Sequence, residues 1–269
     1  MQSLGYPRDY DETTDSITKL FDLSGRVALI TGGGSGLGRA VGLGYARYGA
    51  DVAVVDISEE RAASVAAEIS ATGRRAEPFV VDVTDEIAVQ QLVDRVKAQF
   101  GRIDICVNSA GINVRKPALE MSPDEFKRVI GVNLTGSWLV ARAAGAVMVE
   151  QGRGKVINLA SIYAHVAIEG NGAYAASKGG IAQITKVLAV EWAPKNVQVN
   201  CLSPMYVRTN LTEPLQKNED FIIGTLGRGP TPRFAEAWEM IGPALFLASD
   251  ASGLVTGHSL VVDGGWTAI

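Results

Sequence analysis

Short apolar runs alternate with helix-like segments along almost the whole chain. Runs such as Val27–Ile30 and Asp51–Val55 are apolar at nearly every position rather than at alternate positions, which predicts strands buried on both faces. Between them, Gly38–Tyr48 has the length and composition of a helix and is followed by Gly49. Strands joined through helices run parallel, and the helices then cover both faces of the sheet. The sequence therefore predicts an α/β fold with a doubly wound parallel sheet.

The same pattern places the elements of a single domain, which we expect to span residues 20–269. Strands are expected at 27–30, 51–55, 76–81, 103–107, 154–159, 197–202 and 259–262. Helices are expected at 38–48, 59–71, 86–100, 124–148, 174–191 and 238–248. Met1–Lys19 is polar and acidic with little periodicity, so we expect an arm outside the core. In such a Rossmann-like sheet ligands bind beyond the carboxyl ends of the strands, and functional residues are sought there.

Composition and charge argue against several other classes of protein. Of the 269 residues, 47% are hydrophobic and 20% are charged, which is typical of a globular domain with a sizeable core. A net charge of −4 offers no basic surface for nucleic acid. No run of roughly 18 apolar residues predicts a membrane span, and no signal peptide is recognised, so a cytoplasmic location is expected. The isolated residues Cys106, Cys201, His165 and His258 provide no metal-ligand cluster.

A glycine-rich segment, Thr31–Gly38, separates the first expected strand from the first expected helix. Glycine lets the backbone turn tightly and approach a pyrophosphate, and the helix N-terminus offers free N–H groups and a positive dipole end. Many glycine-rich segments are plain turns, but the position between a strand and a helix favours a dinucleotide site. The candidate cofactor contacts are Gly32, Ser35, Gly36, Leu37 and Gly38.

Asp56 ends the second expected strand, about twenty residues after the glycines. A carboxylate there can accept hydrogen bonds from the adenosine ribose and repel a 2′-phosphate, whereas the alternative is an exposed loop aspartate. No Lys or Arg occurs within Gly32–Gly38, and Asp56 is followed by Ile57 and Ser58 rather than by a basic residue. The sequence therefore predicts NAD rather than NADP as the cofactor, with Asp56 and Ile57 near the adenosine.

Tyr174 and Lys178 are four residues apart in an expected helix, so both side chains can point into one cleft. A free tyrosine has a pKa of about 10, and a neighbouring ammonium lowers that pKa by stabilising the phenolate. Such a pair suits proton transfer in alcohol oxidation or ketone reduction, although the spacing also occurs by chance on many helices. Ser161 follows the fifth expected strand, where its hydroxyl can hold the substrate oxygen.

The glycine spacing and the order of Ser161, Tyr174 and Lys178 resemble the signatures of the short-chain dehydrogenase/reductase family, over about residues 23–266. The resemblance implies that Ser161 positions the substrate oxygen and that Tyr174 transfers its proton. It implies that Lys178 tunes Tyr174 and grips the nicotinamide ribose, while the nicotinamide carries the hydride. It also implies that Asn133 supports a water-linked proton relay through Lys178.

The resemblance implies further cofactor contacts after the other strands. Asp82 would contact the adenine, with Val83 packed on it, and Asn108–Gly111 resembles the family's NNAG with Ser109 in place of the second Asn. The remaining contacts implied are Asn108, Ala110, Gly111, Tyr174, Lys178, Pro204, Val207 and Thr209. Met205 stands where the family usually has glycine, whose backbone conformations a methionine resists, so we expect a changed local backbone and a narrower substrate pocket.

The chain beyond residue 209 also resembles parts of the family. Asn210–Arg233 is long and punctuated by Pro and Gly, and the family places a mobile substrate lid there. Val261–Trp266 resembles the C-terminal strand of tetrameric members, which implies a homotetramer.

The substrate is less constrained than the cofactor. The substrate contacts expected are Ser161, Tyr174, Asn113, His165 and Met205; Arg115, Ile162, Glu169, Asn171 and Tyr206 are further pocket candidates. Because several of these side chains are polar, we expect a sugar, a polyol or a sugar acid, as in the gluconate- and polyol-oxidising members that the chain resembles. A 3-oxoacyl thioester reductase is the alternative enzyme, and a non-catalytic NAD-binding sensor or scaffold is the alternative of another class.

Overall fold

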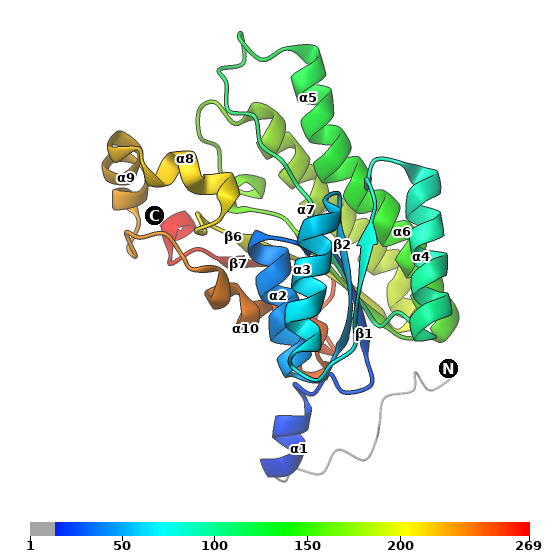
Figure 1. Ribbon diagram of the computed structural model, residues 1–269. Coiled ribbons are helices and arrows are strands. Elements are labelled where there is room, and N and C mark those ends of the chain that lie inside the picture. The colour runs from blue at the N-terminus through cyan, green and yellow to red at the C-terminus, as the bar shows by residue number, and fades with distance from the viewer. Residues whose placement is uncertain (1–13) are drawn as a thin grey trace.

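The computed structural model describes residues 14–269, which contain one seven-stranded sheet with all strands parallel (Figure 1). The strands are β1 (Val27–Thr31), β2 (Asp51–Asp56), β3 (Ala76–Val80), β4 (Ile105–Asn108), β5 (Gly154–Leu159), β6 (Val197–Pro204) and β7 (Ser259–Val262). Their order is β3-β2-β1-β4-β5-β6-β7, so the direction of winding changes between β1 and β4. The expected doubly wound fold is confirmed.

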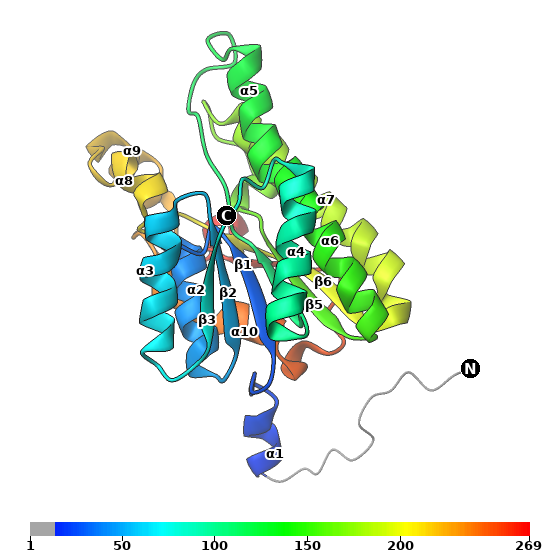
Figure 2. The same ribbon diagram turned by 45° about the vertical axis from the view of Figure 1, so that its right-hand side comes forward.

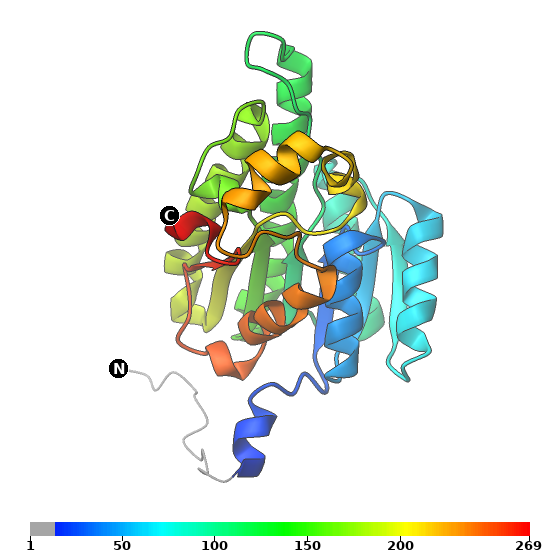
Figure 3. The ribbon, with the colours of Figure 1, turned by 90° about the vertical axis from the view of Figure 1, so that its left-hand side faces the viewer.

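Helices cover both faces of this sheet. They are α2 (Gly36–Arg47), α3 (Glu59–Ser70), α4 (Glu86–Phe100), α5 (Pro123–Ile130), α6 (Ser137–Gln151), α7 (Gly172–Trp192) and α10 (Ile241–Ala248). In β1, Val27 and Leu29 join one core cluster while Ala28 and Ile30 join the other, because successive side chains of a strand point to opposite faces. The first cluster packs under α4, α6 and α7 (Figure 2), and the second packs under α2, α3 and α10 (Figure 3).

Two segments differ from the elements expected from the sequence. The single helix expected at 124–148 is α5 and α6 joined by a six-residue π-helical segment, Gly131–Gly136. The whole helical stretch Pro123–Gln151 is long and apolar enough to cross a membrane, but 56% of its most apolar window is buried inside the fold, as in a core helix. At the other end, α1 (Thr14–Lys19) is helical where we expected an irregular arm, and residues 1–13 of that arm lie outside the described part.

The segment expected to form a lid lies above the carboxyl ends of β6 and β7 (Figure 1). It contains α8 (Glu213–Gln216), α9 (Glu219–Gly224) and two 3-10 turns. Aromatic rings join it to the domain, because Tyr206 packs edge-on against Phe221 with 4.8 Å between the ring centroids. Trp266 near the C-terminus adds a hydrogen bond of 3.0 Å to the carbonyl oxygen of Thr225.

Candidate functional site

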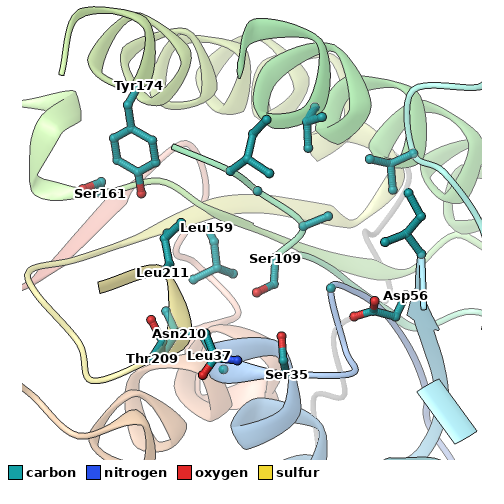
Figure 4. Close-up of a pocket in the computed structure, with 18 of the residues that line it drawn as sticks. Ser35, Leu37, Asp56, Ser109, Leu159, Ser161, Tyr174, Thr209, Asn210 and Leu211 are labelled. Atoms are coloured by element: carbon teal, nitrogen blue, oxygen red, sulfur yellow. The ribbon is translucent and has the colours of Figure 1, made fainter. Parts of the chain in front are cut away.

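A cavity of about 700 Å³ runs along the carboxyl ends of the central strands. Asp56, at the end of β2, lies at one end of the cavity, and Ser161 and Tyr174 lie at the other (Figure 4). Of the contacts expected from the sequence, its wall contains Gly32, Ser35, Gly36, Leu37, Asp56, Ile57, Asp82, Val83, Ala110, Gly111, Ser161, Tyr174, Lys178, Pro204, Met205, Val207 and Thr209. The parallel sheet thus gathers segments that are far apart in the sequence.

The glycine-rich turn has the geometry that a dinucleotide phosphate needs. Gly32 and Gly36 have φ angles of 62° and 50°, which L side chains rarely adopt. Ser35, the N-cap of α2, makes no side-chain hydrogen bond to the helix, and the first turn of α2 has no acidic residue. The first N–H groups of α2 therefore remain available to an anion, which fits a pyrophosphate. Gly38 does not line the cavity; a Cβ there would collide with the Gly32 carbonyl oxygen, so glycine is needed for the turn to pack on α2.

Asp56, the expected adenosine contact, is 5% exposed and lines the end of the cavity opposite Ser161 and Tyr174. Its Oδ2 accepts a hydrogen bond of 3.2 Å from the Gly34 N–H, and its Oδ1 accepts one of 3.0 Å from the Ser58 N–H. The same Oδ1 is 2.7 Å from Nη2 of Arg61, which also lines the cavity. Arg61 lies outside both the glycine-rich segment and the residues directly after Asp56, and only the first turn of α3 brings it back to Asp56.

The segment after β4 contributes backbone and small side chains to the cavity. Ser109, Ala110 and Gly111 line it, but Asn108 does not. Asn108 is 2% exposed, and its Nδ2 donates a hydrogen bond of 2.8 Å to Asn158 Oδ1 on β5. The Asn108 side chain therefore joins two neighbouring strands and does not line the cavity as expected.

Ser161 and Tyr174 meet at the end of the cavity opposite Asp56 (Figure 4). Ser161 follows β5 and Tyr174 lies in the first turn of α7, and the Ser161 hydroxyl is near enough to the Tyr174 hydroxyl to lower its pKa. Lys178, one turn further along α7, is 5% exposed and has its Nζ 5.4 Å from the centroid of the Tyr174 ring. The three residues expected to perform the chemistry are therefore adjacent.

The pKa of Tyr174 differs from the expectation that Lys178 lowers it. Burial raises the pKa of the Tyr174 hydroxyl to about 12, against the smaller opposing effects of the Ser161 hydrogen bond and the Arg115 charge. Lys178 donates its hydrogen bond to the Leu159 carbonyl oxygen, 2.5 Å away, and burial lowers the pKa of this lysine to about 8. Desolvation thus dominates the pKa of Tyr174, and the residue is protonated near neutral pH.

Asn133 is fully buried in the π-helical segment, where its side chain joins two parts of the site. Its Oδ1 accepts from the Ile112 N–H at 2.8 Å, and its Nδ2 donates to the Ile112 carbonyl oxygen and to Ser177 Oγ, each at 3.0 Å. A Cβ added at Gly111 would lie 3.3 Å from Asn133 Oδ1 and 3.9 Å from Lys178 Nζ. Asn133 therefore holds the loop after β4 against α7, close to Lys178.

A small hollow of about 40 Å³ extends the cavity beside Ser161 and Tyr174. It is lined by Asn113, Arg115, Ser161, Tyr163, Tyr174, Met205, Tyr206, Leu211 and Thr212. Arg115 is partly buried and makes no ion pair or hydrogen bond with another side chain in residues 14–269. Asn113 Oδ1 is also buried without a hydrogen-bond partner among the described residues. The hollow therefore offers one cation and one amide oxygen to a polar molecule.

Two expectations about the substrate end are changed by the structure. His165 lines neither the cavity nor the hollow, because it is exposed and its Nε2 lies 2.9 Å from Ser259 Oγ on β7. Met205 lines both, and it keeps an ordinary backbone, since Asn196 is the one non-glycine residue with positive φ in the described part of the chain. Replacing the family's glycine by Met205 therefore narrows the cavity without backbone strain.

Comparison with known proteins gives consistent matches over nearly the whole chain. Residues 32–267 match a family model described as enoyl-(acyl carrier protein) reductase. The chain is 43% identical over 249 residues to D-threitol dehydrogenase of Mycolicibacterium smegmatis, covering 92% of this chain and 95% of that protein. It is also similar to a crystal structure of a short-chain type dehydrogenase/reductase from Mycobacterium marinum, with 40% identity, a TM-score of 0.90 and coverage of 94% and 100%.

A second solved structure is that of a gluconate 5-dehydrogenase from Burkholderia cenocepacia J2315 in complex with NADP and tartrate. Its TM-score is 0.91 and its identity is 38%, with 94% of this chain and 99% of that chain covered. These matches agree with the glycine turn and with the adjacent Ser161, Tyr174 and Lys178. The chain therefore belongs to the short-chain dehydrogenase/reductase family, whose oxidoreductases use a nicotinamide dinucleotide and act on CH–OH groups.

Proposed function

We propose that this chain transfers a hydride between a nicotinamide dinucleotide and a secondary alcohol or ketone of a sugar, polyol or sugar acid. The observation that carries the proposal is that Ser161 and Tyr174 lie together at one end of a cavity whose wall also contains the glycine-rich turn before α2. The bound nicotinamide supplies the hydride acceptor in oxidation and the donor in reduction.

Tyr174 moves the proton in this proposal. In oxidation the substrate O–H bond breaks with its proton passing to Tyr174 Oη, while the C–H bond breaks with its electron pair leaving as hydride; reduction is the reverse. Because burial holds the pKa of Tyr174 near 12, the phenolate needs positive charge nearby, and Lys178 at 5.4 Å from the ring supplies it. Ser161 donates a hydrogen bond to the substrate oxygen, where charge develops.

The substrate class follows from the hollow and from the relatives. Arg115 has no side-chain ion-pair partner in residues 14–269 and lies beside Ser161 and Tyr174, so it can bind a carboxylate distant from the reacting carbon. The relatives named for threitol and gluconate act on a polyol and on a sugar acid. Within the class, Arg115 favours the sugar acid. A 3-oxoacyl thioester is disfavoured, because a hollow of about 40 Å³ lined by Asn113 and Arg115 suits a compact polar group better than an acyl chain.

We further propose that NAD is preferred to NADP, on the carboxylate of Asp56 at the adenosine end. Titration of the purified protein with NADH and NADPH, followed by nicotinamide fluorescence, tests this preference. Tighter binding of NADH supports it, and tighter binding of NADPH overturns it.

The reaction is tested by measuring NAD(P)H formation with a panel of alcohols. Activity with tetritols or aldonates that is absent with apolar secondary alcohols and acyl thioesters supports the proposal. Tyr174→Phe must remove this activity while leaving NADH binding intact. A chain that binds the dinucleotide but turns over nothing, with or without Tyr174, would instead be a sensor or scaffold.

The remaining expectations from the family resemblance stay proposals for this chain. We propose a cytoplasmic homotetramer, because the segment Val261–Trp266 resembles the C-terminal strand of tetrameric members. Light scattering on the purified protein measures the oligomeric state, and a monomeric mass contradicts the tetramer.

A further inference from the structure

Two buried tyrosines, Tyr163 and Tyr206, form a hydrogen-bonded pair beside the catalytic end of the cavity. Their hydroxyl oxygens are 3.0 Å apart, and the two residues are 7% and 3% exposed. Both residues line the hollow of about 40 Å³, and neither lines the larger cavity. The pair is therefore available to a substrate rather than to the dinucleotide.

Tyr163 is held close to both residues that act on the substrate oxygen in the proposed reaction. It follows Ser161 by two positions in a 3-10 turn (Ile162–Ala164), and its N–H donates a hydrogen bond of 3.2 Å to Ser161 Oγ. Its ring packs edge-on against the ring of Tyr174, with 5.7 Å between the centroids. The hydroxyl of Tyr163 is therefore held at a defined position relative to Ser161 and Tyr174.

Tyr206 is held by other aromatic rings. Its ring packs edge-on against Phe221 of α9 and against Phe234, with centroid distances of 4.8 and 6.4 Å. The ring of Tyr163 lies 6.3 Å away, and all four rings belong to one apolar cluster, in which phenylalanine would pack as tyrosine does. The two hydroxyls are therefore not needed for packing, and their burial is unfavourable unless hydrogen bonds offset it.

The pair can make more hydrogen bonds than the protein uses. Burial raises the pKa of both hydroxyls, so both keep their hydrogen atoms at neutral pH. Each phenol has one O–H to donate, and one of the two is used in the bond between Tyr163 and Tyr206. The second O–H has no acceptor among residues 14–269. One hydrogen-bond donor therefore remains for a molecule in the hollow.

We propose that the Tyr163–Tyr206 pair selects substrates that carry a second hydroxyl next to the carbon that reacts. The remaining O–H of the pair donates to that hydroxyl oxygen, while Ser161 and Tyr174 hold the reacting oxygen. A hollow of about 40 Å³ admits only a few heavy atoms, so the group bound there lies close to the reacting carbon. A substrate without this hydroxyl leaves the donor buried and unpaired, which weakens its binding. The proposal rests on the proposed function, because it requires oxidation of an alcohol at Tyr174.

The test compares pairs of substrates. A tetritol and an aldonate are each measured beside the deoxy analogue, in which hydrogen replaces the secondary hydroxyl next to the carbon that is oxidised. The wild type is expected to favour the parent of each pair by at least about tenfold in kcat/KM. In the double variant Tyr163→Phe/Tyr206→Phe this preference should fall roughly 3- to 10-fold, the effect of one lost hydrogen bond between neutral groups. A change in the pKa of Tyr174 leaves the ratio unaltered, because both members of a pair react at Tyr174.

Tyr45→Phe is the matched control. Tyr45 is fully buried, and its hydroxyl donates a hydrogen bond of 2.9 Å to the Ala244 carbonyl oxygen, between α2 and α10. It lines neither the cavity nor the hollow, so this variant removes a buried tyrosine hydroxyl away from the site. Its preference for the parent substrates should equal that of the wild type. Melting curves confirm that each variant is folded before rates are measured.

The outcomes separate this proposal from the function on which it rests. A preference that falls in the double variant and keeps its wild-type value in Tyr45→Phe supports selection by the pair. An unchanged preference in the double variant, an equal fall in Tyr45→Phe, or a wild type that does not distinguish the parent from the deoxy analogue overturns it. If the wild type oxidises none of these alcohols, the proposed function itself fails.

Discussion

Replacing Arg115 by glutamine separates a sugar-acid enzyme from a polyol enzyme. Arg115 lies in the hollow beside Ser161 and Tyr174, is partly buried, and has no side-chain partner in residues 14–269. Its guanidinium would bind a substrate carboxylate through charge-assisted hydrogen bonds, each worth about 1.5–3 kcal/mol. Losing one such bond reduces kcat/KM roughly 10- to 100-fold. The loss should appear for aldonates and be nearly absent for tetritols, which carry no charge.

The same substitution has a second, weaker effect that serves as an internal check. The Arg115 charge lowers the pKa of Tyr174, so Arg115→Gln raises that pKa. Oxidation of every substrate should therefore require a somewhat more alkaline pH, whereas only the acids should show a raised KM. Initial rates against substrate concentration at several pH values distinguish the two effects.

Lys116→Gln provides the control for charge. Lys116 is the next residue, but its Nζ pairs with Glu125 Oε1 at 2.5 Å and it lines neither the cavity nor the hollow. The Lys116→Gln variant should keep kcat/KM for acids and for polyols within about twofold of the wild-type values. Equal losses for aldonates and tetritols in Arg115→Gln, or equal losses in both variants, would refute a carboxylate-binding role for Arg115.

Three further predictions follow from the site. Tyr174→Phe should lower kcat about 100- to 10,000-fold with little change in NADH affinity, as measured by steady-state rates and fluorescence titration; a near-normal kcat would contradict its role. The kcat/KM of ketone reduction should fall as pH rises above about 8, because Lys178 then loses its proton and the charge that supports Tyr174; a profile that stays flat to pH 10 would show that this charge is not needed. Asn133→Ala should lower the free energy of unfolding by roughly 2–5 kcal/mol in urea, because Ile112 and Ser177 lose their buried partner, whereas exposed Gln90→Ala should change it by under about 0.5 kcal/mol.

Local sequence patterns determined the architecture and the chemical groups of this protein. The bounds of α4 and of β5 and β7 were predicted to the residue, because caps, glycines and apolar runs mark those ends within the segment itself. The spacing of Tyr174 and Lys178 also determined that both lie on one helix face, since a helix repeats every 3.6 residues.

Other features depended on what the fold packs against each side chain. Asn108 belongs to an expected motif and His165 is an expected substrate contact, yet Asn108 bonds to Asn158 on the neighbouring strand and His165 bonds to Ser259 on β7, away from the cavity. Such tertiary hydrogen bonds join residues that no local pattern relates. The hydrogen bonds of Asn133 are also long-range, because its side-chain amide bonds to residues 21 and 44 positions away.

The electrostatics of the site were decided by tertiary structure alone. From the sequence, Lys178 should lower the pKa of Tyr174, but burial raises it to about 12. Likewise, a lone carboxylate at Asp56 becomes an ion pair once α3 brings Arg61 within 2.7 Å. The sequence determines which groups are present and roughly where they lie along each element, whereas pKa and charge pairing depend on distance and solvent exclusion, which only the packed fold defines.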